Sequence, residues 1–221
     1  MTARFVFAPS ARAWGWCTPI YIVAALVVAA QAAGPVRAQD RELLNSERIA
    51  ASFGSYGVEV LAQDAQVRVS NLFSGTQAER ICRTFAVVRY PRRVDPAITS
   101  EHAQIVAGGS IGAVFSAHGW QVRKTHLHYG ERAAPAQLAA LMHIDVGTLL
   151  AEHVYALDLV KDGRTIEYAT LAEIHHPDYL LPEELAAIYG PADNGDRREV
   201  VAALLELVTE KGTDQACPSV S

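Results

Sequence analysis

Apolar and polar residues alternate most clearly in two runs, residues 149–161 and 164–176, which flank the dipeptide Asp162-Gly163. Both runs are rich in Leu, Val, Ile, Tyr and Thr, the residue types that favour strands. A two-residue Asp-Gly loop accepts the positive φ angles of a type I′ turn. The pattern therefore predicts a long antiparallel β-hairpin.

A tight turn would fix the register of this hairpin, because Lys161 then pairs with Arg164 and every later pair follows by counting. One face carries the apolar pairs Leu159–Ile166, Leu157–Tyr168 and Ala151–Ile174. The other face carries two carboxylate pairs, Asp158–Glu167 and Glu152–Glu173. Facing carboxylates repel unless a cation, a proton or a hydrogen-bonding ligand lies between them. The hairpin is therefore both the centre of the fold and a candidate site.

Hydrophobic periodicity and stop signals elsewhere in the chain predict four further strands and six helices. Strands are expected over residues 58–62, 67–73, 79–90 and 120–131. Helices are expected over residues 41–53, 96–107, 110–118, 135–142, 182–189 and 197–211. Together they predict an α+β fold, an antiparallel sheet of about six strands with helices packed against it. The wide apolar face of the last helix suggests docking on the sheet or on a second subunit.

The first 38 residues differ in composition from the rest of the chain. Arg4 and Arg12 precede an apolar run, residues 20–30, and small residues then lead to a cleavage-like sequence before Gln39. This pattern predicts an export signal over residues 1–38 and a periplasmic or secreted protein. An uncleaved membrane anchor is the alternative, although the 14 residues from 20 to 33 fall short of the roughly 20 that a span needs. A third alternative is that the start codon has been assigned too early.

Composition limits the remaining function classes. At 221 residues, 50% apolar and 19% charged, the chain can bury one substantial core. The net charge is −5, and without residues 1–38, which hold three arginines and no acid, it becomes −8. Such a surface disfavours nucleic acid as a partner. The domain boundaries expected are 39–190 for the main domain and 191–221 for a linker, a helix and a tail.

The cysteines and histidines leave alternatives open. After cleavage Cys82 and Cys217 remain, either as a disulfide or as a buried thiol and an exposed one. No Cys-x-x-Cys occurs, and no recognised His-carboxylate spacing joins the histidines on the strands, so neither a metal site nor a cofactor is expected. Arg83 lies among apolar neighbours on its strand, either at an edge or as an anchor for an anion.

The stretch from Gln121 to Tyr179 resembles the second half of a UTRA domain, the chorismate lyase-like module that senses small molecules in bacterial regulators. The shared order is a strand, a short helix ending in Leu141-Met-His-Ile-Asp-Val-Gly147, a strand, the Asp-Gly turn, a strand bearing Glu167, and a closing Asp-Tyr. Earlier, Cys82-Arg83-Thr84-Phe85 is similar to the family's Glu-Arg-Thr-Tyr strand. The resemblance covers roughly residues 55–180 and implies that Arg83 and Glu167 contact a ligand.

Three functions are compatible with these observations. The first is an exported, non-catalytic protein that binds a small, anionic molecule, with ligand contacts from Arg83, Glu152, Glu167, Tyr168 and Glu173. The second is an enzyme of chorismate lyase type, in which Arg83 holds a substrate carboxylate. The third is an envelope protein that binds a partner through the 197–211 helix. A homodimer is compatible with each. Family regulators carry a DNA-binding domain before the sensor, where this chain has the expected export signal, so DNA regulation is not expected.

Overall fold

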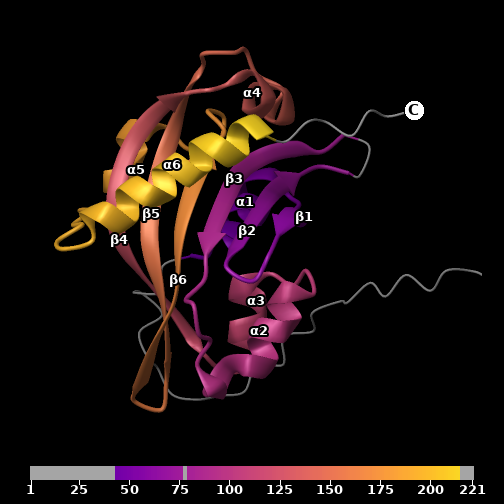
Figure 1. Ribbon diagram of the computed structural model, residues 1–221. Coiled ribbons are helices and arrows are strands. Elements are labelled where there is room, and N and C mark those ends of the chain that lie inside the picture. The colour runs from indigo at the N-terminus through magenta and orange to yellow at the C-terminus, as the bar shows by residue number, and fades with distance from the viewer. Residues whose placement is uncertain (1–42, 77–78, 215–221) are drawn as a thin grey trace, which may run out of the picture. The chain divides into compact units, whose positions relative to one another are not determined.

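The computed structural model describes residues 43–76 and 79–214, which form an α+β fold (Figure 1). The predicted export signal, residues 1–38, and Cys217 lie outside the described residues, so the expected cleavage and the disulfide stay predictions. No helix within the described ranges is both long enough and apolar enough to cross a bilayer.

Six strands form one antiparallel sheet in the order β1-β2-β3-β6-β5-β4. They are β1 (Gly57–Gln63), β2 (Val67–Ser74), β3 (Ile81–Arg89), β4 (Gln121–Ala133), β5 (Leu149–Lys161) and β6 (Arg164–His175). The predicted fold class is therefore confirmed, and the long hairpin, β5 and β6, lies inside the sheet. Helices pack against both faces of this hairpin, which explains why it is largely apolar on both faces.

Two helices cover one face of the sheet, α4 (Ala136–Met142) and α6 (Arg198–Asp214). The yellow α6 crosses this face in Figure 1. Its buried residues Val201, Leu204 and Val208 join a core with Phe85 and Val154 of the strands. The apolar side of α6 thus docks on the sheet, the first of the two arrangements that its sequence suggested.

The opposite face carries the other helices in two groups. α1 (Asn45–Phe53) and α5 (Pro182–Tyr189) pack with Tyr179 at one end of the sheet. The 3₁₀ turn η1 (Pro96–Ile98), α2 (Thr99–Val106) and α3 (Ile111–Ala117) pack on the hairpin at the other end, around Tyr168 and Leu159. The first residues of α1 and α3 approach the same part of the sheet, and the cavity described below lies there.

The hairpin begins as the sequence predicted. Asp162 and Gly163 have φ angles of 50° and 76°, as a type I′ turn requires. Lys161 pairs with Arg164, and the register holds as far as Asp158 opposite Glu167. It then shifts by one residue, because Tyr168 is an extra residue in β6, a β-bulge.

Beyond the bulge the predicted pairs were wrong. Leu157 lies opposite Ala169 and not Tyr168, and Ala151 lies opposite His175 and not Ile174. His153, and not Glu152, lies opposite Glu173. Because neighbouring residues of a strand point to opposite faces, the one-residue shift moves Glu152 and Glu173 to different sides of the sheet. The bulge therefore removes one predicted carboxylate pair and brings histidines to Glu173.

Candidate functional site

A cavity of about 80 Å³ lies between the sheet and the first residues of α1 and α3. A site for one water needs roughly 10–15 Å³ on this scale, so the cavity can hold several waters or a small organic molecule. Most of its surface is apolar, from side chains such as Leu72, Val88 and Leu157. Its charged and polar lining includes Tyr56, Arg68, Ser70, Lys124, Tyr155 and Glu173. An apolar pocket with a few placed polar groups is the usual form of a small-molecule site.

Arg68 of β2 supplies a buried positive charge to the cavity. The residue is 2% exposed. Its guanidinium donates to the carbonyl oxygens of Ile105 (3.0 Å) and Gly109 (2.8 Å) and to Ser70 Oγ (2.8 Å). Within the described part of the chain no carboxylate forms an ion pair with it. A buried charge without a counter-charge is costly, so Arg68 favours an anion in the cavity.

Glu173 of β6 lies at another part of the same lining and is 3% exposed. Its Oε1 accepts hydrogen bonds from Asn45 Nδ2 (3.0 Å) and Tyr155 Oη (3.1 Å). Asn45 in turn accepts from Tyr179 Oη (2.5 Å), which ties the start of α1 to the loop after β6. Burial is the main cause that raises the pKa of the Tyr179 hydroxyl, so this group stays a donor. The network holds the Glu173 carboxylate in place.

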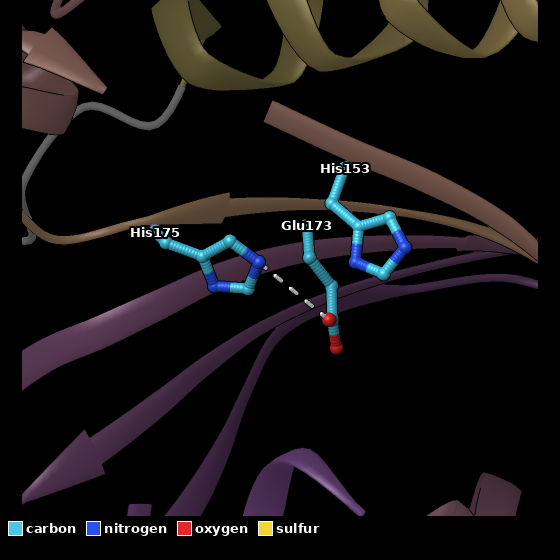
Figure 2. Close-up of side chains that lie close together, drawn as sticks. All are labelled: His153, Glu173 and His175. Carbon is cyan, nitrogen blue, oxygen red and sulfur yellow. Dashed lines mark ion pairs between the residues drawn. The ribbon is translucent and has the colours of Figure 1, made fainter. Parts of the chain in front are cut away.

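Two histidines lie beside this carboxylate, as Figure 2 shows. One ring nitrogen of His153, one of His175 and an oxygen of Glu173 all lie within 4.8 Å of one another, and all three residues are buried. In the register predicted from sequence His153 and Glu173 pointed to opposite faces, so this group was missed. It is a candidate metal-ligand set, although no metal site was expected.

Both imidazoles are held in the neutral form. Burial lowers the pKa of His175 to about 3, and the positive charges of Lys124 and Arg48 contribute. Burial also lowers the pKa of His153 well below its usual value, with smaller contributions from His175 and His126. A neutral imidazole has one nitrogen with a lone pair, which can accept a proton, a hydrogen bond or a metal ion.

Of the ligand-binding residues predicted from sequence, Glu173 lines the cavity and Arg83 does not. Arg83 packs over the Phe53 ring at 3.9 Å from its centroid, donates to Ser74 Oγ (2.9 Å) and lies 3.7 Å from an oxygen of Asp178. It joins α1, β2 and the loop after β6. The chorismate lyase hypothesis used Arg83 as the substrate anchor, and the residue is engaged elsewhere.

The other three predicted residues do not line the cavity either. Glu152 is buried and forms an ion pair with the partly buried Arg132 on the face that α6 covers. Tyr168 is fully buried in the bulge, and its hydroxyl bonds His102 Nδ1 at 2.9 Å. Glu167 is exposed and pairs with Arg197 at 3.2 Å. Its predicted neighbour Asp158 pairs with an arginine too, so the repulsion expected between the two carboxylates is relieved by cations.

Cys82 lies in β3 and is 1% exposed. Burial raises the pKa of its thiol, so it is not a reactive thiolate at neutral pH. Its expected partner Cys217 is outside the described residues, and the pairing of the two stays a prediction.

Arg68 was not predicted from sequence as a site residue. In β2, Arg68 and Ser70 alternate with Val67 and Val69, and such alternation is typical of a strand with one face in water. A polar cavity lining has the same pattern as a solvent-exposed face. The structure distinguishes a cavity lining from an exposed face here, because α2 and the turn before α3 lie over β2.

No protein-family model matches the chain, and neither does any curated protein. Among solved structures the chain is similar to a GntR-family transcriptional regulator from Enterococcus faecalis, at 12% identity and a TM-score of 0.37, over 57% of this chain and 93% of that one. It is similar to a transcriptional regulator from Streptomyces coelicolor, at 21% identity and a TM-score of 0.32, over 60% and 79%. It is also similar to the C-terminal domain of Yurk from Bacillus subtilis, at 14% identity and a TM-score of 0.34, over 57% and 90%. Membership of the UTRA family stays a prediction.

Proposed function

We propose that this chain is a binding module for a small anionic molecule, which occupies the cavity between the sheet, α1 and α3. The charged group of the ligand lies beside Arg68, and a hydroxyl or amine group of the ligand donates a hydrogen bond to Glu173. The observation that carries the proposal is the buried guanidinium of Arg68, which lines the cavity without a carboxylate partner in the described ranges. An anionic ligand would supply the missing counter-charge.

Two further features support binding. The cavity is largely apolar, so that a small molecule gains from leaving water there. The sequence resemblance to UTRA domains implies the same kind of function, with Glu173 and Arg68 in place of the residues that the resemblance favoured. The proposal is one of binding without catalysis.

A thermal-shift screen with small carboxylates, phosphates and hydroxy or amino acids tests the proposal, followed by calorimetry on each hit. Arg68→Met is expected to weaken binding by about 10- to 100-fold, because a hydrogen bond to a charged group contributes about 1.5–3 kcal/mol. Arg68 also holds the turn before α3, so a second variant is needed. Ala86→Leu projects a larger side chain into the cavity from β3 and is expected to abolish binding.

Ala62→Leu is the matched control, because Ala62 is exposed on β1 and does not line the cavity. This variant should bind as the wild type does. Unchanged affinity in the folded Ala86→Leu protein would place the ligand elsewhere and contradict the proposal. The proposal would also be contradicted if the protein purified from its native host carried no bound molecule and no compound in the screen stabilised it.

An exported location is the second part of the proposal, and it rests on the composition of residues 1–38. N-terminal sequencing of the protein from its native host is expected to begin at Gln39. A mature chain that begins at the first methionine would exclude a cleaved signal.

A further inference from the structure

The group formed by His153, Glu173 and His175 has the composition of a transition-metal site. The two strands of the hairpin supply all three ligands, because His153 of β5 lies directly opposite Glu173 of β6 and His175 follows two residues later on the same face. Figure 2 shows both imidazole rings turning a nitrogen toward the carboxylate side chain between them. Two imidazoles and one carboxylate are a donor set that Zn²⁺ and other first-row divalent ions accept.

The nitrogens that face Glu173 have no hydrogen-bond partner. His153 Nδ1 and His175 Nε2 are both buried and unsatisfied among the described residues, and both histidines are 0% exposed. A buried polar atom without a partner costs about 1–3 kcal/mol, so a pair of them at one place calls for an explanation. A bound ion would satisfy both.

The other nitrogen of each ring is already engaged. His153 Nε2 lies 2.9 Å from His126 Nδ1, and His175 Nδ1 lies 3.1 Å from Thr84 Oγ1. Metal-binding histidines use one nitrogen for the ion and hold the ring in place through the other. When Nε2 of His153 and Nδ1 of His175 donate to these partners, the lone pairs of both rings point toward Glu173.

A direct interaction between the histidines and Glu173 does not account for the arrangement. His175 Nε2 and Glu173 Oε2 are 3.9 Å apart, too far for a hydrogen bond. Two ligands of one tetrahedral ion, each about 2.0–2.2 Å from the metal, lie about 3.3–3.6 Å apart. The three atoms lie within 4.8 Å of one another, so binding an ion needs shifts of less than about 1 Å per side chain.

We propose that His153, Glu173 and His175 bind one divalent first-row transition-metal ion, with Zn²⁺ as the test ion. Nitrogen donors argue against Mg²⁺ and Ca²⁺, which prefer ligand sets made of oxygen. Three protein ligands leave at least one coordination position open. Glu173 also lines the cavity, so the ion would lie next to it. The inference does not depend on the anionic ligand, since it concerns the metal alone.

Lys124 opposes metal binding and offers an independent check. It lines the same cavity, and its positive charge acts on both histidines. Replacement of this charge should reduce repulsion of the ion, so Lys124→Met is expected to bind Zn²⁺ more tightly than the wild type does. Weaker binding by this variant would contradict the placement of the ion.

The experiment uses the full chain without a histidine tag, treated with EDTA and then titrated with ZnCl₂ by calorimetry. The expected result is one ion per chain, together with a rise in unfolding temperature as Zn²⁺ is added. His153→Gln and His175→Gln should each weaken binding by at least about 100-fold, because loss of an outer partner of a metal ligand already costs about 10- to 100-fold. His143→Gln, at an exposed position, is the matched control and should leave binding unchanged.

A wild-type chain that binds neither Zn²⁺ nor Co²⁺ overturns the inference. Zinc binding that persists in both histidine variants also overturns it, because the ion then lies elsewhere. If those variants do not fold, crystals of the wild type grown with ZnCl₂ decide the question through an anomalous peak between the three side chains, or through its absence. Arg68→Met should still bind Zn²⁺, which separates this inference from the proposed ligand site.

Discussion

Lowering the pH from 6.5 to 4.5 is expected to reduce the free energy of unfolding of the metal-free protein, by about 2 kcal/mol through His175 and by a further contribution of the same sign through His153. Their folded-state pKa values lie below the ordinary value of 6.5, that of His175 at about 3, because both rings are buried. Below pH 6.5 the unfolded chain therefore binds protons that the folded chain does not. Stability contributed by the neutral rings is present above pH 6.5 and is lost as the pH falls.

Urea unfolding at several pH values measures this slope. His175→Gln removes one of the two groups, so its stability should fall less steeply between pH 6.5 and 4.5, by about 1.4 kcal/mol per pH unit. Equal slopes for the wild type and His175→Gln would contradict the prediction, because the buried ring of His175 would then take up its proton in the folded state.

Glu152→Gln is expected to lower the free energy of unfolding by about 2–3 kcal/mol, because it leaves the partly buried Arg132 without its counter-charge. Glu152 is 4% exposed, and its partner Arg132 also donates to Thr209 Oγ1 (3.3 Å) and to the Leu205 carbonyl (3.5 Å) of α6. The pair thus links β5, β4 and α6. Ligand binding in the cavity on the other face should not change.

Glu167→Gln is the matched control for this measurement. Glu167 was predicted from sequence as a ligand residue, as Glu152 was, and it too pairs with an arginine, Arg197 at 3.2 Å. Its side chain is 61% exposed, so its loss should cost no more than about 1 kcal/mol. Guanidinium unfolding curves of both variants give the comparison. A similar cost for the two would contradict the structural role of Glu152.

Sequence periodicity was enough to predict the strands, the helices and the Asp162-Gly163 turn, because these follow from local pattern and turn chemistry. The pairing of residues in the hairpin was predicted by counting from the turn, and one extra residue in β6 shifts every pair beyond it. Tyr168 has no sequence mark of a bulge, since a tyrosine in a strand is ordinary. What makes it the extra residue is packing, for its ring lies against Phe115 of α3 at 4.7 Å between centroids.

The sequence does not distinguish the surroundings of Arg83 from those of Arg68 for a related reason. Both arginines occur in strands among apolar residues, and both are buried, at 7% and 2% exposure. Arg83 is covered by Phe53 of α1, whereas Arg68 lies under the turn between α2 and α3 and borders the cavity. Which helix covers which strand is tertiary information, and spacing along one strand does not contain it.

The bulge in β6 also bears on how this site could arise or disappear during evolution. A related hairpin of the same length that pairs without the bulge, with Tyr168 opposite Leu157, would present the residue at Glu173 to the side of the sheet that α6 covers. Deletion of Tyr168 would instead close the bulge and leave Glu173 opposite His153. Loss of the bulge at constant length, and not loss of the extra residue, is then the change that removes the histidine–carboxylate group. Relatives that lack the extra residue should be aligned from the His175 end of the strand, since a gap-free alignment anchored at the turn places these side chains one residue out of register.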